Sequence, residues 1–263
     1  MIYEGLKYFI SPFFLDIYRL FKSKYLNFGN KRFLKNNKDF HNIYFGQSVH
    51  IFANGPSLND RIQSQLAGQK VIVMNDFFRS NYRDSFDIVA LCYAEPASSD
   101  AFSKDNIKEI IQKTKAKTFW LDISLSNKNL NKSNCNKTIN YILPGYEPNL
   151  LFSSKIDLSK MTLSYNTTAS MAIMVAMYMG FKDIRLHGFN HDWLANPDFS
   201  RHFYSDKKDT TDKWNQFSYH QQIVVVDRIW RIYIKLSKLC MSKGIKVINC
   251  TENSFLDVFE KEL

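Results

Sequence analysis

The sequence predicts an α/β fold with one mainly parallel β-sheet and helices on both of its faces. Short apolar segments alternate with longer helical segments from about residue 46 to the end of the chain. The composition, with 45% hydrophobic and 15% aromatic residues, is typical of a globular protein. The length of 263 residues is enough for one large domain with a substantial core.

The predicted strands are short apolar runs that end in turn residues. They lie at residues 49–53, 70–74, 88–92, 118–121, 184–187 and 246–249. Helices are predicted at residues 57–66, 100–113, 168–179 and 216–242, with a short one after residue 254. The stretches 123–163 and 190–215 do not fit the alternation, and we expect the second to form a lid over a ligand. This order predicts a Rossmann-like domain at residues 46–263.

A basic amphipathic helical segment is predicted at residues 1–45. Residues 1–40 contain eight Lys or Arg against three Asp or Glu, so half of the net charge of +10 lies there. Apolar and aromatic side chains recur at helical spacing, with an interruption at Ser11 and Pro12. The pattern fits a helix on an anionic membrane surface and, equally well, a helix packed on the domain or on a second subunit of a homo-oligomer.

Several classes of protein are disfavoured by the sequence. The longest apolar run, Ala169 to Phe181, is shorter than the roughly 20 residues of a membrane-spanning helix. The four cysteines are scattered and no secretory signal is visible, which predicts a cytoplasmic setting. No helix-turn-helix, zinc-finger or RNA-recognition motif is present, so we expect no nucleic-acid partner. No D-x-D sequence, the usual arrangement for holding a divalent ion on a sugar nucleotide diphosphate, is present, so magnesium need not be invoked. We expect no metal ion and no other cofactor.

The tetrad Asn54-Gly55-Pro56-Ser57 follows the first predicted strand, and Asn75 follows the second. A small-residue turn between a strand and a helix is suited to binding an anion such as a nucleotide phosphate. Gly55 is expected to let a ligand approach closely, and Ser57 to cap the next helix. The chain contains no G-x-G-x-x-G or phosphate-loop motif. By itself, the tetrad is more typical of an ordinary strand-to-helix turn than of a binding site.

Further polar groups follow other strands or begin helices. The segment with Asn166, Thr167 and Thr168 opens an apolar helix whose free amides are able to bind a carboxylate or phosphate, or it serves only as a helix cap. Tyr93 follows the third strand and is a candidate for lining a pocket. Glu95, two residues later, is an acid or base candidate or a solvated turn residue.

Four of the six histidines fall in or beside the predicted lid: His187, His191, His202 and His220. Imidazole is the side chain whose ordinary pKa lies nearest neutrality, so one of them is a candidate general base. A zinc site formed by His187, His191, Asp192, His202 and Asp206 is the competing hypothesis. It lacks the usual ligand spacing, and the general base is the favoured hypothesis.

Two sequence blocks, in this order, resemble the bacterial sialyltransferases of glycosyltransferase family 42. The first runs from Val49 to Leu58 and continues at Asn75; the second comprises Thr167 to Ser170 and the block from Gly180 to Asn190. The segment from Gly188 to Trp193, with residues 201–204 and 248–254, also resembles the related pterin-pyrophosphokinase-like family, which includes motility accessory factors. The resemblance implies a sialyltransferase-type fold, a GT-A-like variant, over about residues 48–258.

The resemblance also implies roles for individual residues. Asn54 and Asn75 would bind a cytidine nucleotide, Thr167 and Thr168 the donor sugar, and His220 or His202 would be the catalytic base. Two departures are Asp192, near the place of a family tyrosine, and Asn166, in place of a family arginine. The complete expected donor-binding set is Asn54, Gly55, Pro56, Ser57, Asn75, Tyr93, Asn166, Thr167, Thr168, Gly188, Asn190, His191, Asp192 and Tyr204.

The expected function is that of an inverting, metal-independent glycosyltransferase. It would move a sialic-acid-like sugar from a CMP donor to a surface glycan, such as lipooligosaccharide or capsule, or to a lipid-linked acceptor. The expected location is the inner face of the cytoplasmic membrane. Two alternatives stand beside it: a pterin pyrophosphokinase-like enzyme that uses ATP and magnesium, and a non-enzymatic membrane-associated glycan-binding protein.

Overall fold

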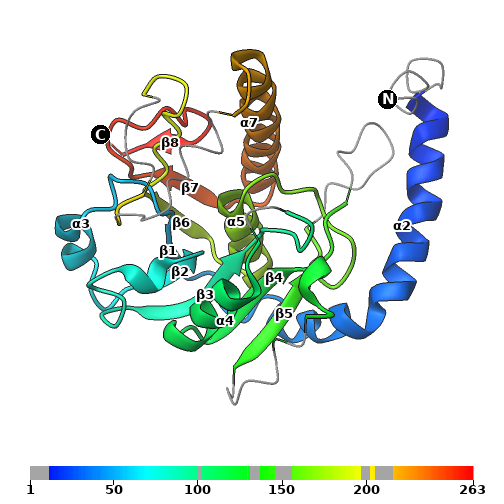
Figure 1. Cartoon of the computed structure of the whole chain (residues 1–263), viewed down its shortest axis with the longest axis horizontal. Helices are drawn as coiled ribbons and strands as arrows, with labels where there is room; N and C mark the ends of the chain where they lie inside the picture. Colours follow the sequence, from blue (N-terminus) through cyan, green and yellow to red (C-terminus); the bar gives the residue numbers. More distant parts are fainter. Residues whose placement is uncertain are drawn as a thin grey trace.

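The centre of the molecule is a single sheet of eight strands in the order β5-β4-β3-β2-β1-β6-β7-β8 (Figure 1). The structure, a computed structural model, describes residues 12–99, 102–128, 130, 137–145, 156–196, 202–204 and 216–262. All neighbouring strands are parallel. The strands are β1 (Ser48–Phe52), β2 (Lys70–Met74), β3 (Asp87–Tyr93), β4 (Thr118–Asp122), β5 (Thr138–Ile142), β6 (Asp183–His187), β7 (Lys246–Asn249) and β8 (Glu260–Lys261).

Helices cover both faces of the sheet, which confirms the predicted α/β class. They are α2 (Pro12–Leu34), α3 (Asp60–Gln65), α4 (Lys104–Lys113), α5 (Thr168–Met179) and α7 (Tyr219–Ser242), with short 3-10 helices η1 (Lys35–Phe40), η2 (Phe77–Arg79) and η3 (Ile123–Leu125). One hydrophobic core joins α5 and α7 to the sheet, and a second joins α4 to its opposite face. Successive residues of a strand point to opposite faces, so Ile51 belongs to the first core and Phe52 to the second.

Helix α5 is the central helix, and its bounds match the predicted ones. Thr167 and Ser170 form a reciprocal capping box at its start, and Gly180 ends it in the left-handed conformation at φ 95°. Eleven of its twelve residues are buried, because α5 lies between the sheet and α7. A helix that is apolar on every side is stable only in such a place.

Three elements differ from those predicted from the sequence. The predicted helix at residues 57–66 begins only at Asp60, because the side chain of Asn59 caps it by accepting a hydrogen bond from the backbone amide of Ile62. The irregular stretch 123–163 contains β5, which is held by its pairing with β4. The segment after residue 254 contributes the short edge strand β8 rather than a helix. β5 and β8 were not predicted because their residues are locally polar, and each forms its strand hydrogen bonds only with a neighbouring strand.

The N-terminal segment, as far as the structure describes it, is the long helix α2, which begins at Pro12 as expected. The C-terminal end of α2 is fixed to the β5 edge of the domain by the buried Leu34 and by the ring of Phe33 against Tyr141. Further up, the Asn27 side chain accepts a hydrogen bond from the Met161 amide at 2.6 Å. No helix in the described part of the chain is long and apolar enough to cross a membrane.

The strand order places a topological switch point between β1 and β6. From β1 the chain builds outward through β2, β3, β4 and β5, and then returns to pair β6 with the other side of β1. The connections from β1 and β6 therefore leave in opposite directions, which opens a crevice beyond the carboxyl ends of the strands. Ligands of open α/β sheets characteristically bind in such a crevice.

Candidate active site

A cavity of about 400 Å³ lies at this switch point. It collects residues from the ends of β1, β2 and β6, the start of α5, and the segments around residues 202 and 217. The sequence-predicted site residues that line it are Asn54, Gly55, Pro56, Asn75, Thr167, Thr168, Gly188, Asn190, His191, Asp192 and His202. Positions separated by almost 150 residues in the sequence are thus brought into one site.

The turn after β1 interlocks with the turn after β6. The Gly55 amide donates to the Gly188 carbonyl at 3.1 Å, and the Ser57 hydroxyl donates to Asn190 Oδ1 at 2.7 Å. A Cβ atom on Gly55 would stand 2.3 Å from both Asn190 Oδ1 and the Gly188 carbonyl oxygen. The close approach of the neighbouring turn therefore already requires glycine at position 55, and the predicted approach of a ligand to Gly55 stays a prediction. Ser57 likewise joins the two turns and caps no helix.

Asn54 is nearly buried at the base of the cavity, with 5% of its surface exposed. Its side-chain amide donates to the Met74 carbonyl at 3.2 Å and to the Tyr204 hydroxyl at 3.4 Å. Its Oδ1 atom is buried and has no hydrogen-bond partner among the described residues. Buried polar atoms in folded proteins almost always have a partner, so Asn54 Oδ1 is an unused acceptor beside the cavity and a candidate for a ligand N–H or O–H group.

Asn75 and the start of α5 form the opposite wall. Asn75 adopts the left-handed backbone conformation at φ 49°, which Asn tolerates better than most residues. Its Oδ1 accepts a hydrogen bond from the Thr168 hydroxyl at 3.2 Å. Thr167 caps α5, because its hydroxyl oxygen accepts a hydrogen bond from the backbone amide of Ser170. The α5 dipole presents its positive end to the cavity at Thr168 and Ala169.

Three described residues of the predicted lid, His202 to Tyr204, lie against the β1 turn. The Phe203 amide donates to the Asn54 carbonyl at 2.9 Å, and the Phe203 ring packs on Phe77 in the second core. The rings of His202 and Tyr204 are stacked with centroids 5.0 Å apart, and the Arg79 guanidinium lies 5.2 Å from the Tyr204 ring. Residues 197–201 and 205–215 of that prediction lie outside the described residues.

His191 is held in the cavity wall by an aromatic cluster. Its Nε2 lies 3.0 Å from the Tyr233 hydroxyl, and its ring packs edge-on against Trp193 and Trp230. Burial lowers the pKa of His191 to about 3. The imidazole is therefore neutral at physiological pH, which suits it to hydrogen bonding rather than to accepting a proton.

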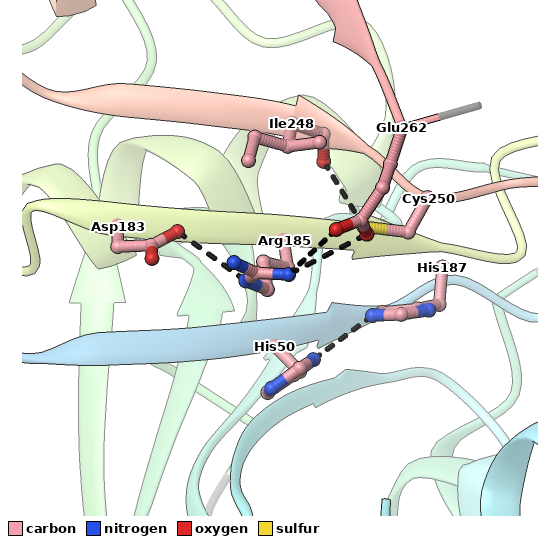
Figure 2. A network of polar contacts seen from close by, with 7 residues as sticks. All are labelled: His50, Asp183, Arg185, His187, Ile248, Cys250 and Glu262. Atoms are coloured by element: carbon pink, nitrogen blue, oxygen red, sulfur yellow. Dashed lines mark hydrogen bonds and ion pairs between the residues drawn. The ribbon is translucent and has the colours of Figure 1, made fainter.

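His187 does not belong to the cavity, although the sequence grouped it with the other histidines. It pairs with His50 at 2.9 Å on the sheet, beside a network in which Arg185 contacts both Asp183 and Glu262 (Figure 2). The zinc hypothesis required His187 beside His191 and His202. No three metal-ligating side chains come together among the described residues, and Asp206 lies outside them.

The buried His187 gives a test of the fold. Burial lowers the pKa of His187 to about 3 from the ordinary value of 6.5, so the unfolded chain binds this proton first as the pH falls. Stability from this group is complete above pH 6.5 and declines below it. Urea titrations between pH 6.5 and 5 measure this effect as the slope of the free energy of unfolding against pH. We expect that slope to be steeper in the unsubstituted protein than in His187→Gln, by about 1 kcal/mol per pH unit. An unchanged slope in His187→Gln would contradict this, and His41→Gln, at an exposed site, is the control.

Three other expected residues lie outside the cavity lining. Tyr93 packs in the second core, where burial raises the pKa of its phenol. The exposed Asn166 donates to the Arg228 carbonyl at 3.0 Å. His220 is exposed in the first turn of α7, and Phe217, three residues earlier, reaches the cavity.

A second hollow, of about 520 Å³, adjoins the first. It lies at the ends of β3, β4 and β5, and the two hollows share Thr167 and Thr168. Its polar lining includes Glu95, Asn166 and the buried Asp122, which accepts a hydrogen bond from the Tyr165 hydroxyl at 2.6 Å. Two ligands could therefore meet at the start of α5.

Sequence reasoning did not identify the apolar part of the first cavity. Phe189, Trp193, Phe217 and Ile229 all line it. Trp193 follows the Gly188 to Asp192 run that was singled out for its polar residues. Phe217, just before α7, and Ile229, in the middle of α7, carried no signal, because an apolar residue that lines a cavity is indistinguishable in sequence from a core residue.

The chain is similar in fold to solved structures of sialyltransferases. No family model and no curated protein matches the chain. Among solved structures, the chain is similar to a sialyltransferase CST-II in complex with a trisaccharide acceptor and CMP, at 15% identity and a TM-score of 0.43, over 82% of this chain and 85% of that one. It is also similar to the sialyltransferase CstII from Campylobacter jejuni in complex with cytidine-5'-monophosphate, at 17% identity and a TM-score of 0.45, with the same coverage of both chains.

Proposed function

We propose that the protein is a glycosyltransferase that transfers a sialic-acid-like sugar from a CMP donor to a glycan. The observation that carries the proposal is the cavity at the switch point, in which Asn54 Oδ1, Asn75 and the start of α5 converge. Carboxamides recognise the edge of a base or a ribose, and a helix start favours an anion. A nucleotide with a single phosphate would place its base or ribose against the carboxamides and its phosphate at the start of α5.

The charge of the cavity supports a metal-independent reaction. Apart from histidines, Asp192 is the only ionisable side chain in its described lining. A magnesium nucleotide usually needs clustered carboxylates, and a single one is a poor substitute. In this proposal the leaving CMP phosphate is stabilised by the α5 dipole and by neutral donors such as the NH2 group of the Asn75 side chain.

The second hollow would receive the acceptor. A sugar hydroxyl held by Glu95 and Asn166 would approach the donor across Thr167 and Thr168. Attack on the anomeric carbon from the side opposite CMP inverts its configuration. His202, which lines the donor cavity, or His220, at the exposed start of α7, would take the hydroxyl proton. We propose a cell-surface or lipid-linked glycan as acceptor and the inner face of the cytoplasmic membrane as the place of action.

Calorimetry with CMP, and separately with ATP and magnesium, tests the proposal. We expect CMP to bind and Asn54→Ala to weaken that binding about tenfold, because a buried hydrogen bond to the ligand is lost. Asn36→Ala, at an exposed position of η1, is the matched control. Binding of ATP with magnesium but not of CMP would favour the pyrophosphokinase alternative and overturn the proposal.

A donor screen extends the same test to turnover. CMP-sugars are compared with UDP- and GDP-sugars, and release of the free nucleotide is measured. We expect release from a CMP-sugar only. Release from a UDP-sugar alone would contradict the proposed donor, and no release from any donor would favour the non-enzymatic glycan-binding alternative.

A further inference from the structure

Helix α2 carries a row of five exposed aromatic side chains, here called the aromatic stripe. Its members recur at alternating steps of four and three residues, and each has at least 60% of its surface exposed. They are Phe14 (64%), Tyr18 (60%), Phe21 (68%), Tyr25 (76%) and Phe28 (81%). At about 100° per residue, the five positions fall within roughly 80° of the helix circumference. Isolated exposed aromatic residues are common in proteins, whereas a continuous row marks an interaction surface.

The aromatic stripe faces away from the domain. Of the α2 residues that contact the body, Asn27, which accepts a hydrogen bond from the Met161 amide, and the buried Leu34 are on the opposite side of the helix. Phe33, which packs on Tyr141, is on its flank. Figure 1 shows α2 as a rod beside the domain, joined to it near β5. The stripe therefore lies on the exposed side of a helix that is joined to the domain through its C-terminal part, and Tyr18, Phe21, Tyr25 and Phe28 are each at least 60% exposed.

Basic side chains surround the stripe. Lys22 and Lys24 lie about 80° to either side of its centre on the helix circumference, and the Lys22 ammonium lies 5.7 Å from the Tyr18 ring. Between residues 12 and 40 the chain has seven Lys or Arg and two acidic residues, Asp16 and Asp39. The matching surface is therefore apolar at its centre and anionic around it.

The same charges disfavour a second copy of this helix as the partner that covers the aromatic stripe. The four-three spacing would suit a coiled coil. However, the flanking positions that normally carry opposite charges hold Lys22, Lys24 and Lys31 and no acid. In an antiparallel pair these lysines would face lysines. In a parallel pair Lys22 and Lys24 would face Ile17 and Gly29, without an ion pair.

We propose that the aromatic stripe of α2 docks the protein on the surface of an anionic lipid bilayer. The rings lie at the boundary between headgroups and acyl chains, and the flanking lysines contact anionic headgroups. This extends the proposed function by naming the residues and the lipid chemistry, but binding itself does not depend on the enzymatic activity. Vesicle binding and CMP binding can therefore fail independently.

Vesicle co-sedimentation with the full chain tests the proposal. We expect binding to vesicles of phosphatidylcholine with about 30% phosphatidylglycerol, much weaker binding to phosphatidylcholine alone, and weakening by salt. The triple substitution Phe21→Ser, Tyr25→Ser, Phe28→Ser should reduce binding at least about tenfold. Phe45→Ser, which removes an aromatic ring that is 69% exposed on another segment, is the matched control and should bind normally.

Two further measurements make the outcome decisive. Thermal unfolding should be nearly unchanged in the triple variant, because its three rings are exposed in the free protein. The fluorescence of Tyr25→Trp should be quenched by brominated lipids if the stripe enters the bilayer. Undiminished vesicle binding by the triple variant, or no binding by the unsubstituted protein, overturns the proposal. So does a dimer in analytical ultracentrifugation that the triple variant converts to monomers, since a second copy would then cover the stripe.

Discussion

Replacing His202 with asparagine is expected to lower kcat for sugar transfer about 100- to 10 000-fold. Under the proposed function, His202 accepts the proton of the attacking hydroxyl, and it is the histidine that lines the cavity without being held in the aromatic cluster of His191. The measurement is initial-rate kinetics with a CMP-sugar across pH 5 to 9. The rate of the unsubstituted enzyme should fall at low pH, because the base is protonated there. The residual rate of His202→Asn should not show this fall.

Two companion variants separate this role from its alternatives. His220→Asn tests the rival base on α7, and His41→Asn, at an exposed site between η1 and β1, is a control for loss of an imidazole. CMP affinity should stay within a few-fold in His202→Asn, because a base acts on the acceptor. Full activity in His202→Asn would exclude it as the base. A large loss in His220→Asn alone would assign the role to His220.

Replacing Gly188 with alanine is expected to destabilise the protein by about 2 to 5 kcal/mol and to abolish CMP binding. Gly188 has φ 76°, and an added Cβ would stand 2.3 Å from the Ala53 carbonyl oxygen. That oxygen belongs to the turn that carries Asn54, so the new methyl group would push apart the two turns that form the cavity floor. Urea unfolding measures the stability, and calorimetry with CMP measures the site.

Gly68→Ala is the matched control for Gly188→Ala. Gly68 has φ 81°, nearly the same backbone conformation, but nothing lies within 4 Å of its added Cβ. It should therefore show only the cost of the left-handed conformation, about 1 to 2 kcal/mol, and bind CMP normally. If the two variants prove equally destabilised and both bind CMP, the contact between the turns has no role in forming the site.

Much of the fold could be predicted because its signals are local. The apolar runs of β2 and β7 and the capped apolar helix α5 appear in the sequence at the bounds that the structure gives them. The position of the site was also predictable, since parallel strands bring their carboxyl ends to one edge. Asn54 and Asn75 follow two strands and were expected to face one crevice if those strands were neighbours; the pairing of β1 with β2 meets that condition.

The errors arose where the structure depends on distant neighbours. β5 is a strand because β4 offers it hydrogen bonds, and its own sequence Thr138–Ile142 carries only a weak pattern. His187 and His191 are four residues apart, yet one lies on the sheet beside His50 and the other in the cavity. The strand ends between them at Gly188, whose positive φ turns the chain. Proximity in sequence was therefore a poor guide to the histidine cluster.

The sequence by itself determined the α/β class, the edge of the sheet at which a ligand would bind, and the polar residues at the ends of β1 and β2. These follow from hydrophobic periodicity and turn chemistry, which act over a few residues. Only the tertiary structure decided that Gly55 serves a neighbouring turn, that Asn54 Oδ1 is left without a partner among the described residues, and that the α2 stripe faces away from the domain. Each of these depends on which distant segment packs against a residue, and short-range sequence patterns do not contain that information.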